Sequence, residues 1–195
     1  MTYSSGTWTV VIPIRPAGKS RLQVPGIDQP RLARAIALDT IATVAQVAYV
    51  RVVTCDPTLR LQGTDLVLEP EPRGINVAVR LGLVGMIGHR AALLGDLPAL
   101  DPKDLTAALR LAEDVDLGAV GDVEGTGTTL VTASPGVQLI PSFGPGSWTK
   151  HMHSGFTPLP VPNDSTVRRD VDLAEHLIGP LGPRTTAVLA DAALH

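Results

Sequence analysis

A chain of 195 residues, 44% of them hydrophobic and 18% charged, is long enough to bury the core of one domain and lacks the composition of a disordered protein. The formal net charge of −3 and the aromatic content of 3% argue against a nucleic-acid-binding protein, because such proteins carry basic patches or aromatic rings that stack on the bases. Cys55 is the only cysteine, so neither a disulfide framework nor a thiolate metal site can form. We recognise no signal peptide and no membrane-spanning apolar run, and we expect a cytoplasmic protein without membrane partners.

The first half of the chain contains apolar, β-branched runs that alternate with longer segments carrying helix caps. The first run stops at Pro13, because proline cannot continue a central strand. Pro30 suits the first turn of a helix. These patterns predict strands over residues 10–12, 49–55 and 65–68 and helices over residues 28–47 and 74–87.

The second half continues the same alternation. Residues 91–94 form a predicted strand that runs into Gly95-Asp96-Leu97-Pro98, and Asp101-Pro102 caps a helix to about residue 112. Further strands are predicted over 117–120, 128–132 and 167–171, with a short helix over 147–153 and a last helix after 171. We expect one domain over residues 1–195, with its core in 8–178 and a tail over 179–195 that wraps the surface or frays.

Strands that alternate with helices indicate an α/β fold with a mostly parallel sheet. In such sheets ligands bind beyond the carboxyl ends of the strands. The loops after Ile12, Leu94 and Val171 are therefore the first places to look for a functional site.

The loop after the first strand carries three cations, Arg15, Lys19 and Arg21. Gly18-Lys19-Ser20 is similar to the end of a P-loop, but Pro13 stands where that motif needs glycine. A loop that presents cations to a triphosphate is one interpretation, and a solvated basic loop is the other.

Carboxylates follow two other predicted strands. Asp96 comes directly after a buried strand and is a good ligand for a hard metal ion; the alternative role, helix capping, is already filled by Asp101. Asp170 and Asp172 would share one face of a strand, where two like charges repel unless a cation lies between them. Asp172 is more simply explained as the cap of the last helix, which leaves Asp170 as the stronger metal ligand.

Two glycine-rich loops suit a small anion. Gly125-Thr126-Gly127-Thr128-Thr129 precedes a strand and is not a dinucleotide fingerprint, but its glycines and hydroxyls allow close approach of an anion. Phe143-Gly144-Pro145-Gly146-Ser147 ends at a helix start, where free N–H groups attract negative charge. The alternative is a pair of structural turns with Ser147 as an ordinary N-cap.

These sites occur in a specific order, and the chain as a whole resembles the guanylyltransferase family of coenzyme F420 biosynthesis. Members of that family act on 2-phospho-L-lactate or phosphoenolpyruvate. The resemblance covers about residues 8–178. It rests on Ile12-Pro13-Ile14-Arg15-Pro16, Gly18-Lys19-Ser20-Arg21-Leu22, Arg73-Gly74-Ile75-Asn76, Gly95-Asp96-Leu97-Pro98, Gly127-Thr128-Thr129, Phe143-Gly144-Pro145-Gly146-Ser147 and Arg168-Arg169-Asp170-Val171-Asp172.

The resemblance implies a three-layer αβα fold of the nucleotide-diphospho-sugar transferase type with a mostly parallel mixed sheet. It also implies Mg²⁺ as cofactor, and GTP and a small phosphorylated carboxylic acid as substrates; a homodimer is compatible with it. Asp96 belongs with Lys19 and Arg21 in the implied catalytic set. The implied ligands are Arg15, Lys19, Arg21, Gly74 and Asn76 for the nucleotide, Asp96, Asp170 and Asp172 for the metal, and Thr128, Thr129, Gly144 and Ser147 for the acceptor.

The implied reaction needs no protein nucleophile, because an acceptor phosphate oxygen can attack the α-phosphorus of GTP directly. Positioning and charge neutralisation then account for catalysis. Two alternatives remain. One is a molybdopterin-type or cytidylyl transferase of the same fold; the molybdopterin type usually has a glycine-rich loop after the first strand, which residues 13–16 lack here. A non-catalytic nucleotide-binding homologue would be favoured by loss of the metal carboxylates, but Asp96 and Asp170 are present.

Overall fold

The computed structural model describes residues 8–15, 22–59 and 61–192. Two of the implied phosphate ligands, Lys19 and Arg21, lie outside these ranges. The strands of the described chain form one seven-stranded sheet. They are β1 (Trp8–Pro13), β2 (Tyr49–Thr54), β3 (Thr64–Leu68), β4 (His89–Leu93), β5 (Leu117–Gly121), β6 (Thr128–Ala133) and β7 (Thr157–Pro158).

The strand order is β3-β2-β1-β4-β6-β5-β7. β1 pairs in parallel with β2 and β4, and β2 with β3, whereas β6 runs antiparallel to both of its neighbours, β4 and β5. The predicted mostly parallel, mixed sheet is confirmed. Because β6 is reversed, the residues before it lie at the same edge of the sheet as the residues after β1, β2 and β4.

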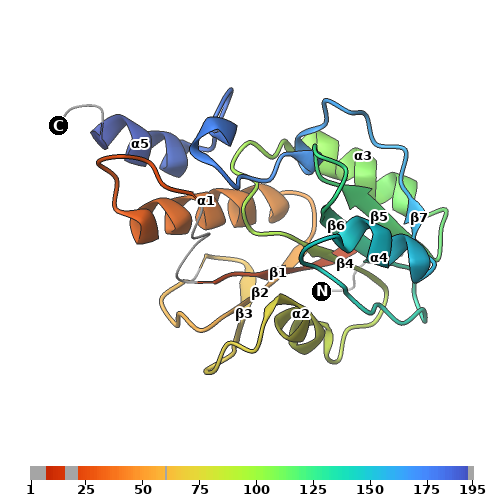
Figure 1. Ribbon diagram of the computed structural model, residues 1–195. Coiled ribbons are helices and arrows are strands. Elements are labelled where there is room, and N and C mark those ends of the chain that lie inside the picture. Colours follow the sequence, from red (N-terminus) through yellow and green to blue (C-terminus); the bar gives the residue numbers. More distant parts are fainter. Residues whose placement is uncertain (1–7, 16–21, 60, 193–195) are drawn as a thin grey trace.

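Helices cover both faces of the sheet (Figure 1). They are α1 (Gln29–Val44), α2 (Ile75–Leu83), α3 (Pro102–Ala112), α4 (Ser147–His153) and α5 (Pro183–Ala192). None of the described helices is both long enough and apolar enough to cross a membrane.

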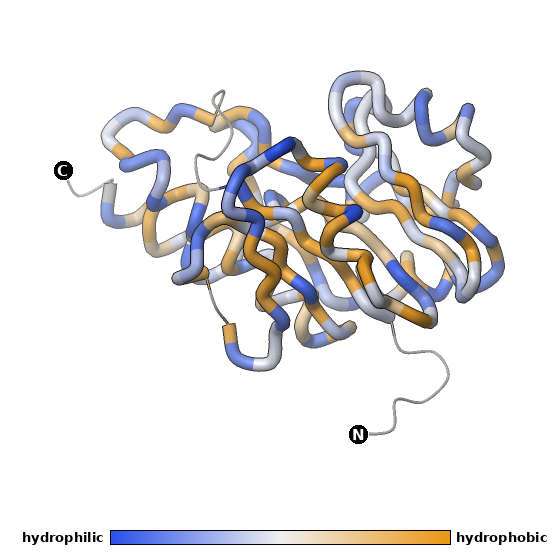
Figure 2. The backbone as a smooth tube through the Cα atoms, turned by 90° about the horizontal axis from the view of Figure 1, so that it is seen from below, coloured by the Kyte–Doolittle hydropathy of each residue, from blue (hydrophilic) through white to orange (hydrophobic). Residues whose placement is uncertain are grey.

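Alternate residues of β1 face opposite layers of the core. Val10 and Ile12 pack in an apolar cluster with residues of α1 and α3, such as Ile41 and Leu105. Val11 belongs to a second cluster, which contains residues of α2 and α4. Figure 2 shows hydrophobic segments running through the middle of the molecule. The expected three-layer αβα fold is therefore confirmed.

The segment predicted as a strand over 167–171 is not a strand. Residues Thr166–Arg168 form a 3-10 helix, and the sheet edge beside β5 is occupied by β7 instead. The backbone N–H and the hydroxyl of Thr166 both donate to the Asp104 carboxylate of α3, at 2.7 and 2.6 Å. This contact with a distant residue holds the segment in a turn, and local β propensity cannot reveal it.

The last helix begins later than predicted. Only a short 3-10 helix, Ala174–His176, follows Asp172, so the interpretation of Asp172 as a helix cap is wrong. Residues 183–192, expected to wrap the surface or fray, form α5, which packs beside α1 in Figure 1. Asp39 of α1 explains this helix: its buried carboxylate accepts the N–H and the hydroxyl of Thr185, at 2.7 and 2.8 Å.

Candidate functional site

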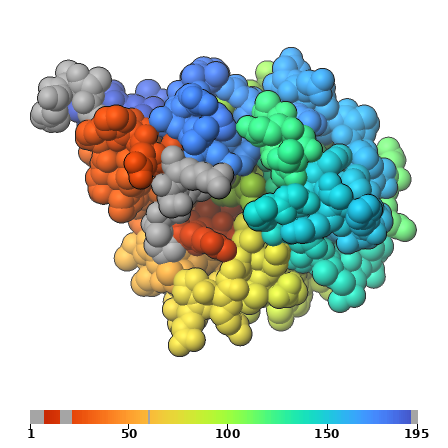
Figure 3. Space-filling model, viewed as in Figure 1, coloured from red at the N-terminus to blue at the C-terminus, as the bar shows by residue number. Residues whose placement is uncertain are grey.

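A cleft of about 1010 Å³ opens at the edge of the sheet where the sequence predicts ligand binding. Its walls come from the loops after β1, β2, β3 and β4, the loop before β6, the start of α4 and the segment 170–172. Figure 3 shows the hollow between the yellow segment that leads to α2 and the cyan segment of α4. The described site candidates that line the cleft are Arg15, Gly74, Asn76, Asp96, Thr128, Gly144, Ser147, Asp170 and Asp172.

Thr129 lies outside the cleft. It follows Thr128 on β6, and successive residues of a strand point to opposite faces. Its side chain is fully buried, with its hydroxyl 3.4 Å from the Val120 carbonyl oxygen, to which it donates. We therefore leave Thr129 out of the acceptor site.

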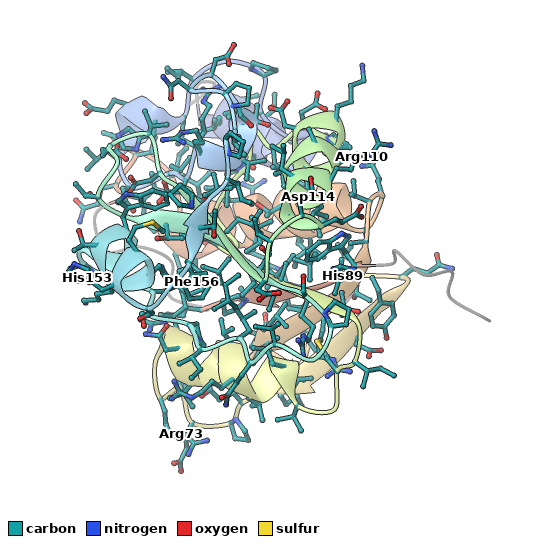
Figure 4. All side chains as sticks on the ribbon, turned by 90° about the vertical axis from the view of Figure 1, so that its right-hand side faces the viewer. Arg73, His89, Arg110, Asp114, His153 and Phe156 are labelled. Carbon is teal, nitrogen blue, oxygen red and sulfur yellow. The ribbon has the colours of Figure 1, made fainter. Side chains whose placement is uncertain are left out.

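One end of the cleft combines a cation with a helix start. The Arg15 guanidinium lies over Gly74, because a Cβ built on this glycine would be 3.8 Å from an Arg15 nitrogen. Gly74 has a φ of 105° and precedes α2, whose first backbone N–H groups have no partner within the helix. Arg73 is exposed nearby and points outward (Figure 4). This end of the cleft is suited to phosphate groups.

The Asn76 side chain ties the two sides of the cleft together. Its amide nitrogen donates to the Phe143 carbonyl at 3.0 Å, and its oxygen accepts the Phe143 N–H at 2.8 Å. This reciprocal pair joins α2 to the loop that carries Gly144. These bonds give Asn76 a positioning role, and because the amide nitrogen carries a second hydrogen, its contact with the nucleoside stays a prediction.

The Asp96 loop is held from two directions. The Leu97 N–H donates to the buried Thr40 hydroxyl of α1 at 3.1 Å, and the Val171 N–H donates to the Asp96 carbonyl at 3.0 Å. The second bond brings the segment 170–172 against the loop after β4. The structure therefore brings the two carboxylate segments that the sequence singles out, 74 residues apart, into one site.

Sequence reasoning missed Asp122, which follows β5. Its carboxylate accepts the N–H groups of Thr126 and Gly127, at 2.9 and 2.6 Å, and so shapes the glycine-rich loop. Carboxylate oxygens of Asp122, Glu124 and Asp170 lie within 4.8 Å of one another. The rule that singled out Asp96, an acid directly after a buried strand, could also have found Asp122.

The other end of the cleft holds Thr128, whose hydroxyl lies 3.0 Å from Nδ1 of His151. His151 is fully buried in α4, and its Nε2 accepts the Ser142 N–H at 2.9 Å. Burial lowers the pKa of this imidazole to about 4, so the ring is neutral at pH 7. With Nε2 as acceptor, the single ring proton sits on Nδ1, where it faces the Thr128 hydroxyl and the Ser147 backbone. The Thr128 hydroxyl hydrogen is then left to donate into the cleft.

Ser147 is the first residue of α4 and is 2% exposed. The N-cap of this helix is Gly146, in the left-handed region with a φ of 66°, so Ser147 is not the cap. The Trp148 N–H donates to the Thr126 carbonyl at 3.2 Å, which fixes the helix start beside the glycine-rich loop. Ser147, Gly144 and Thr128 thus form a second polar end of the cleft.

No family model matches the chain. The phosphoenolpyruvate guanylyltransferase of Streptomyces scabiei is 40% identical over 207 residues, which cover 94% of this chain and 96% of that protein. That of Salinispora arenicola is 41% identical over 205 residues and covers 95% of each chain. Among solved structures, a nucleotidyl transferase from Methanothermobacter has a TM-score of 0.58 at 15% identity, covers 95% of this chain and 99% of that one, and shows the same fold.

Proposed function

The chain belongs to the phosphoenolpyruvate guanylyltransferase family, and we propose that it transfers GMP from GTP to phosphoenolpyruvate with release of pyrophosphate. One observation carries the proposal: a single cleft is lined by Arg15 and the start of α2, by Thr128 and Ser147, and by the carboxylates Asp96 and Asp170. Transfer between two anionic substrates requires this arrangement, because both must be held while their mutual repulsion is offset. As the family resemblance implies, we assign the reaction to coenzyme F420 biosynthesis.

The donor triphosphate is proposed to bind Arg15 and the first N–H groups of α2 behind Gly74. Lys19 and Arg21, which lie outside the described residues, remain proposed phosphate ligands because they belong to the same loop as Arg15. These cations would offset the negative charge that builds up on the leaving pyrophosphate.

The carboxylates that line and border the cleft fit a hard divalent cation. Asp96, Asp170 and Asp172 line the cleft, and Asp122 and Glu124 place carboxylate oxygens within 4.8 Å of those of Asp170. Mg²⁺ binds oxygen ligands at about 2.1 Å, so its ligands lie roughly 3–4 Å apart. When bound, Mg²⁺ neutralises phosphate charge and orients the phosphates. We propose Asp96 and Asp170 as its principal protein ligands, with Asp172 beside them.

The acceptor is proposed to bind at the other end of the cleft. The Thr128 and Ser147 hydroxyls and the N–H groups near Gly144 would hold its carboxylate and phosphate. A phosphate oxygen of the acceptor attacks the α-phosphorus of GTP. The new bond joins that oxygen to the α-phosphorus, the bond to the β-phosphate oxygen breaks, and pyrophosphate leaves with the electron pair. The chain therefore only has to align and neutralise the reactants.

Incubation with each of the four nucleoside triphosphates, combined with phosphoenolpyruvate or 2-phospho-L-lactate, tests this function. Pyrophosphate release and product mass are the readouts. We expect GTP to be preferred and phosphoenolpyruvate to be at least as good an acceptor as 2-phospho-L-lactate, since a pocket that holds the shared anions discriminates the rest weakly. Comparable turnover with CTP or ATP, or activity confined to phospholactate, would contradict the proposal.

A further inference from the structure

The cleft contains a carboxylate that the proposed transfer does not use. Glu69 follows β3, at the opposite end of the sheet from Asp122 and Glu124. It lines the cleft but is only 6% exposed. Its backbone N–H donates to the Thr54 carbonyl at 3.0 Å, which extends the pairing of β3 with β2 and fixes the position of the residue.

Among the described residues, the hydrogen bond that the Glu69 carboxylate accepts leaves it with capacity to accept more from a ligand. One oxygen accepts the Arg73 N–H at 3.2 Å, which closes the turn before α2. Within residues 8–15, 22–59 and 61–192, no lysine or arginine forms an ion pair with it. A carboxylate so deeply buried is costly unless hydrogen-bond donors surround it. A ligand that brings such donors into the cleft would supply them.

Among the nucleobases, guanine matches this carboxylate best. Its N1–H and its 2-amino group are adjacent donors on one edge, and the two oxygens of a carboxylate can accept both. Adenine and cytosine present a ring-nitrogen acceptor at the corresponding position, which a carboxylate repels. Uracil offers one N–H between two carbonyl oxygens.

The position of Glu69 agrees with this role. From β3 the sheet edge passes β2 and β1, where Arg15 stands, before it reaches Asp96 after β4 and Thr128 at the start of β6. Three strand spacings separate the ends of β3 and β4, which amounts to about 14 Å, the scale of one nucleotide. The order along the edge is then the base at Glu69, the phosphates at Arg15, the proposed metal ligand Asp96 and the acceptor at Thr128.

We propose that Glu69 is the residue that selects guanine, its carboxylate accepting hydrogen bonds from N1–H and the 2-amino group of GTP. This inference rests on the proposed use of GTP as donor.

The test compares Glu69→Gln with Glu71→Gln, an equivalent change at an exposed position two residues away. Glutamine keeps an acceptor for the Arg73 N–H, so the turn is preserved. The readout is kcat/KM for GTP, for inosine triphosphate, which lacks the 2-amino group, for xanthosine triphosphate, which has a 2-oxo group, and for ATP.

We expect the wild-type protein to rank GTP above inosine, xanthosine and adenosine triphosphates. Glu69→Gln should lower kcat/KM for GTP about 10- to 100-fold, as expected for a lost hydrogen bond to a charged group. It should also raise activity with xanthosine triphosphate, because the glutamine amide can donate to the 2-oxo group. The KM for phosphoenolpyruvate and all properties of Glu71→Gln should stay unchanged.

A Glu69→Gln protein with the wild-type ranking of donors, or an equal loss in Glu71→Gln, would overturn the inference and leave the proposed function intact. A wild-type protein that uses ATP as well as GTP would instead contradict the proposed function. If Glu69→Gln does not fold, Glu69→Asp carries the test, since it keeps the charge. It should retain GTP above xanthosine triphosphate at reduced kcat/KM, and equal use of the two would refute the role of Glu69.

Discussion

At the scale of single residues, the two adjacent threonines of β6 offer a matched comparison. Thr128→Val removes the hydroxyl that His151 orients toward the cleft, whereas Thr129→Val removes one that donates within the core. We expect Thr128→Val to raise the KM for phosphoenolpyruvate about tenfold or more and to leave the KM for GTP unchanged. Thr129→Val should change neither constant. Steady-state kinetics decides, and a larger effect on GTP than on the acceptor would refute this assignment of Thr128.

The buried imidazole of His151 predicts a pH-dependent stability. Burial lowers its pKa to about 4, from about 6.5 in the unfolded chain, so the unfolded state binds more protons between these values. Its contribution to the free energy of unfolding is complete above about pH 6.5 and is lost as the pH falls toward 4. Between pH 7.5 and pH 5 the loss is on the order of 2 kcal/mol. Thermal melts should show it, and His151→Asn should flatten the slope while exposed His153→Asn should not.

Asp170 is expected to be needed for turnover but not for folding. Its carboxylate lies within 4.8 Å of those of Asp122 and Glu124, and its segment is also held through the Val171 N–H, so Asp170→Asn should stay folded. Turnover should fall about 100-fold or more, because a charged ligand at the reacting phosphates is lost. Asp164→Asn, in an exposed loop outside the cleft, serves as control. A mutant that melts early but turns over normally would show that Asp170 only fixes a turn.

At the scale of helices and strands, α5 depends on one buried carboxylate. Asp39 accepts hydrogen bonds from the backbone N–H groups of Arg184 and Thr185 and from the Thr185 hydroxyl. Asp39→Ala should lower the free energy of unfolding by about 3 kcal/mol and expose Arg184 to trypsin. Asp191→Asn alters an exposed ion pair with Arg31 and should cost less than about 1 kcal/mol. Equal melting temperatures for the two variants would contradict the role of Asp39.

The helices and strands differ in how far the sequence predicts them. Strands β1, β2, β4, β5 and β6 follow from apolar runs, because most residues of each are buried. The N-cap of α3 is also local: Asp101 accepts the Lys103 N–H at 2.7 Å. By contrast, α5 needs Asp39, 146 residues before Thr185, and the turn at Thr166 needs Asp104, so neither could be read from a local pattern.

In the candidate site, too, some residues could be predicted from the sequence and others could not. Asp96 and Ser147 were predictable because loops at one edge of a parallel sheet converge. His151 and Glu69 were not, since their roles depend on burial and on partners from other segments. The bonds of Asn76 to the Phe143 backbone also depend on a distant segment, so its positioning role could not be predicted from a local pattern.

At the scale of the whole molecule, the proposed metal ligands line the same cleft as the proposed nucleotide site, so metal binding and nucleotide binding should be linked. We expect EDTA to abolish turnover and Mg²⁺ to restore it, while the apo protein stays folded, because an apolar core packs on both faces of the sheet. Mg²⁺ takes few protein ligands and completes its shell with water and substrate phosphates. It should therefore raise the melting temperature little alone and clearly more with GTP, as linkage requires for a ligand that binds only the folded state. Asp170→Asn should lose this additional rise. Full turnover in EDTA, or an equal rise in Asp170→Asn, would rule out a metal site at these carboxylates.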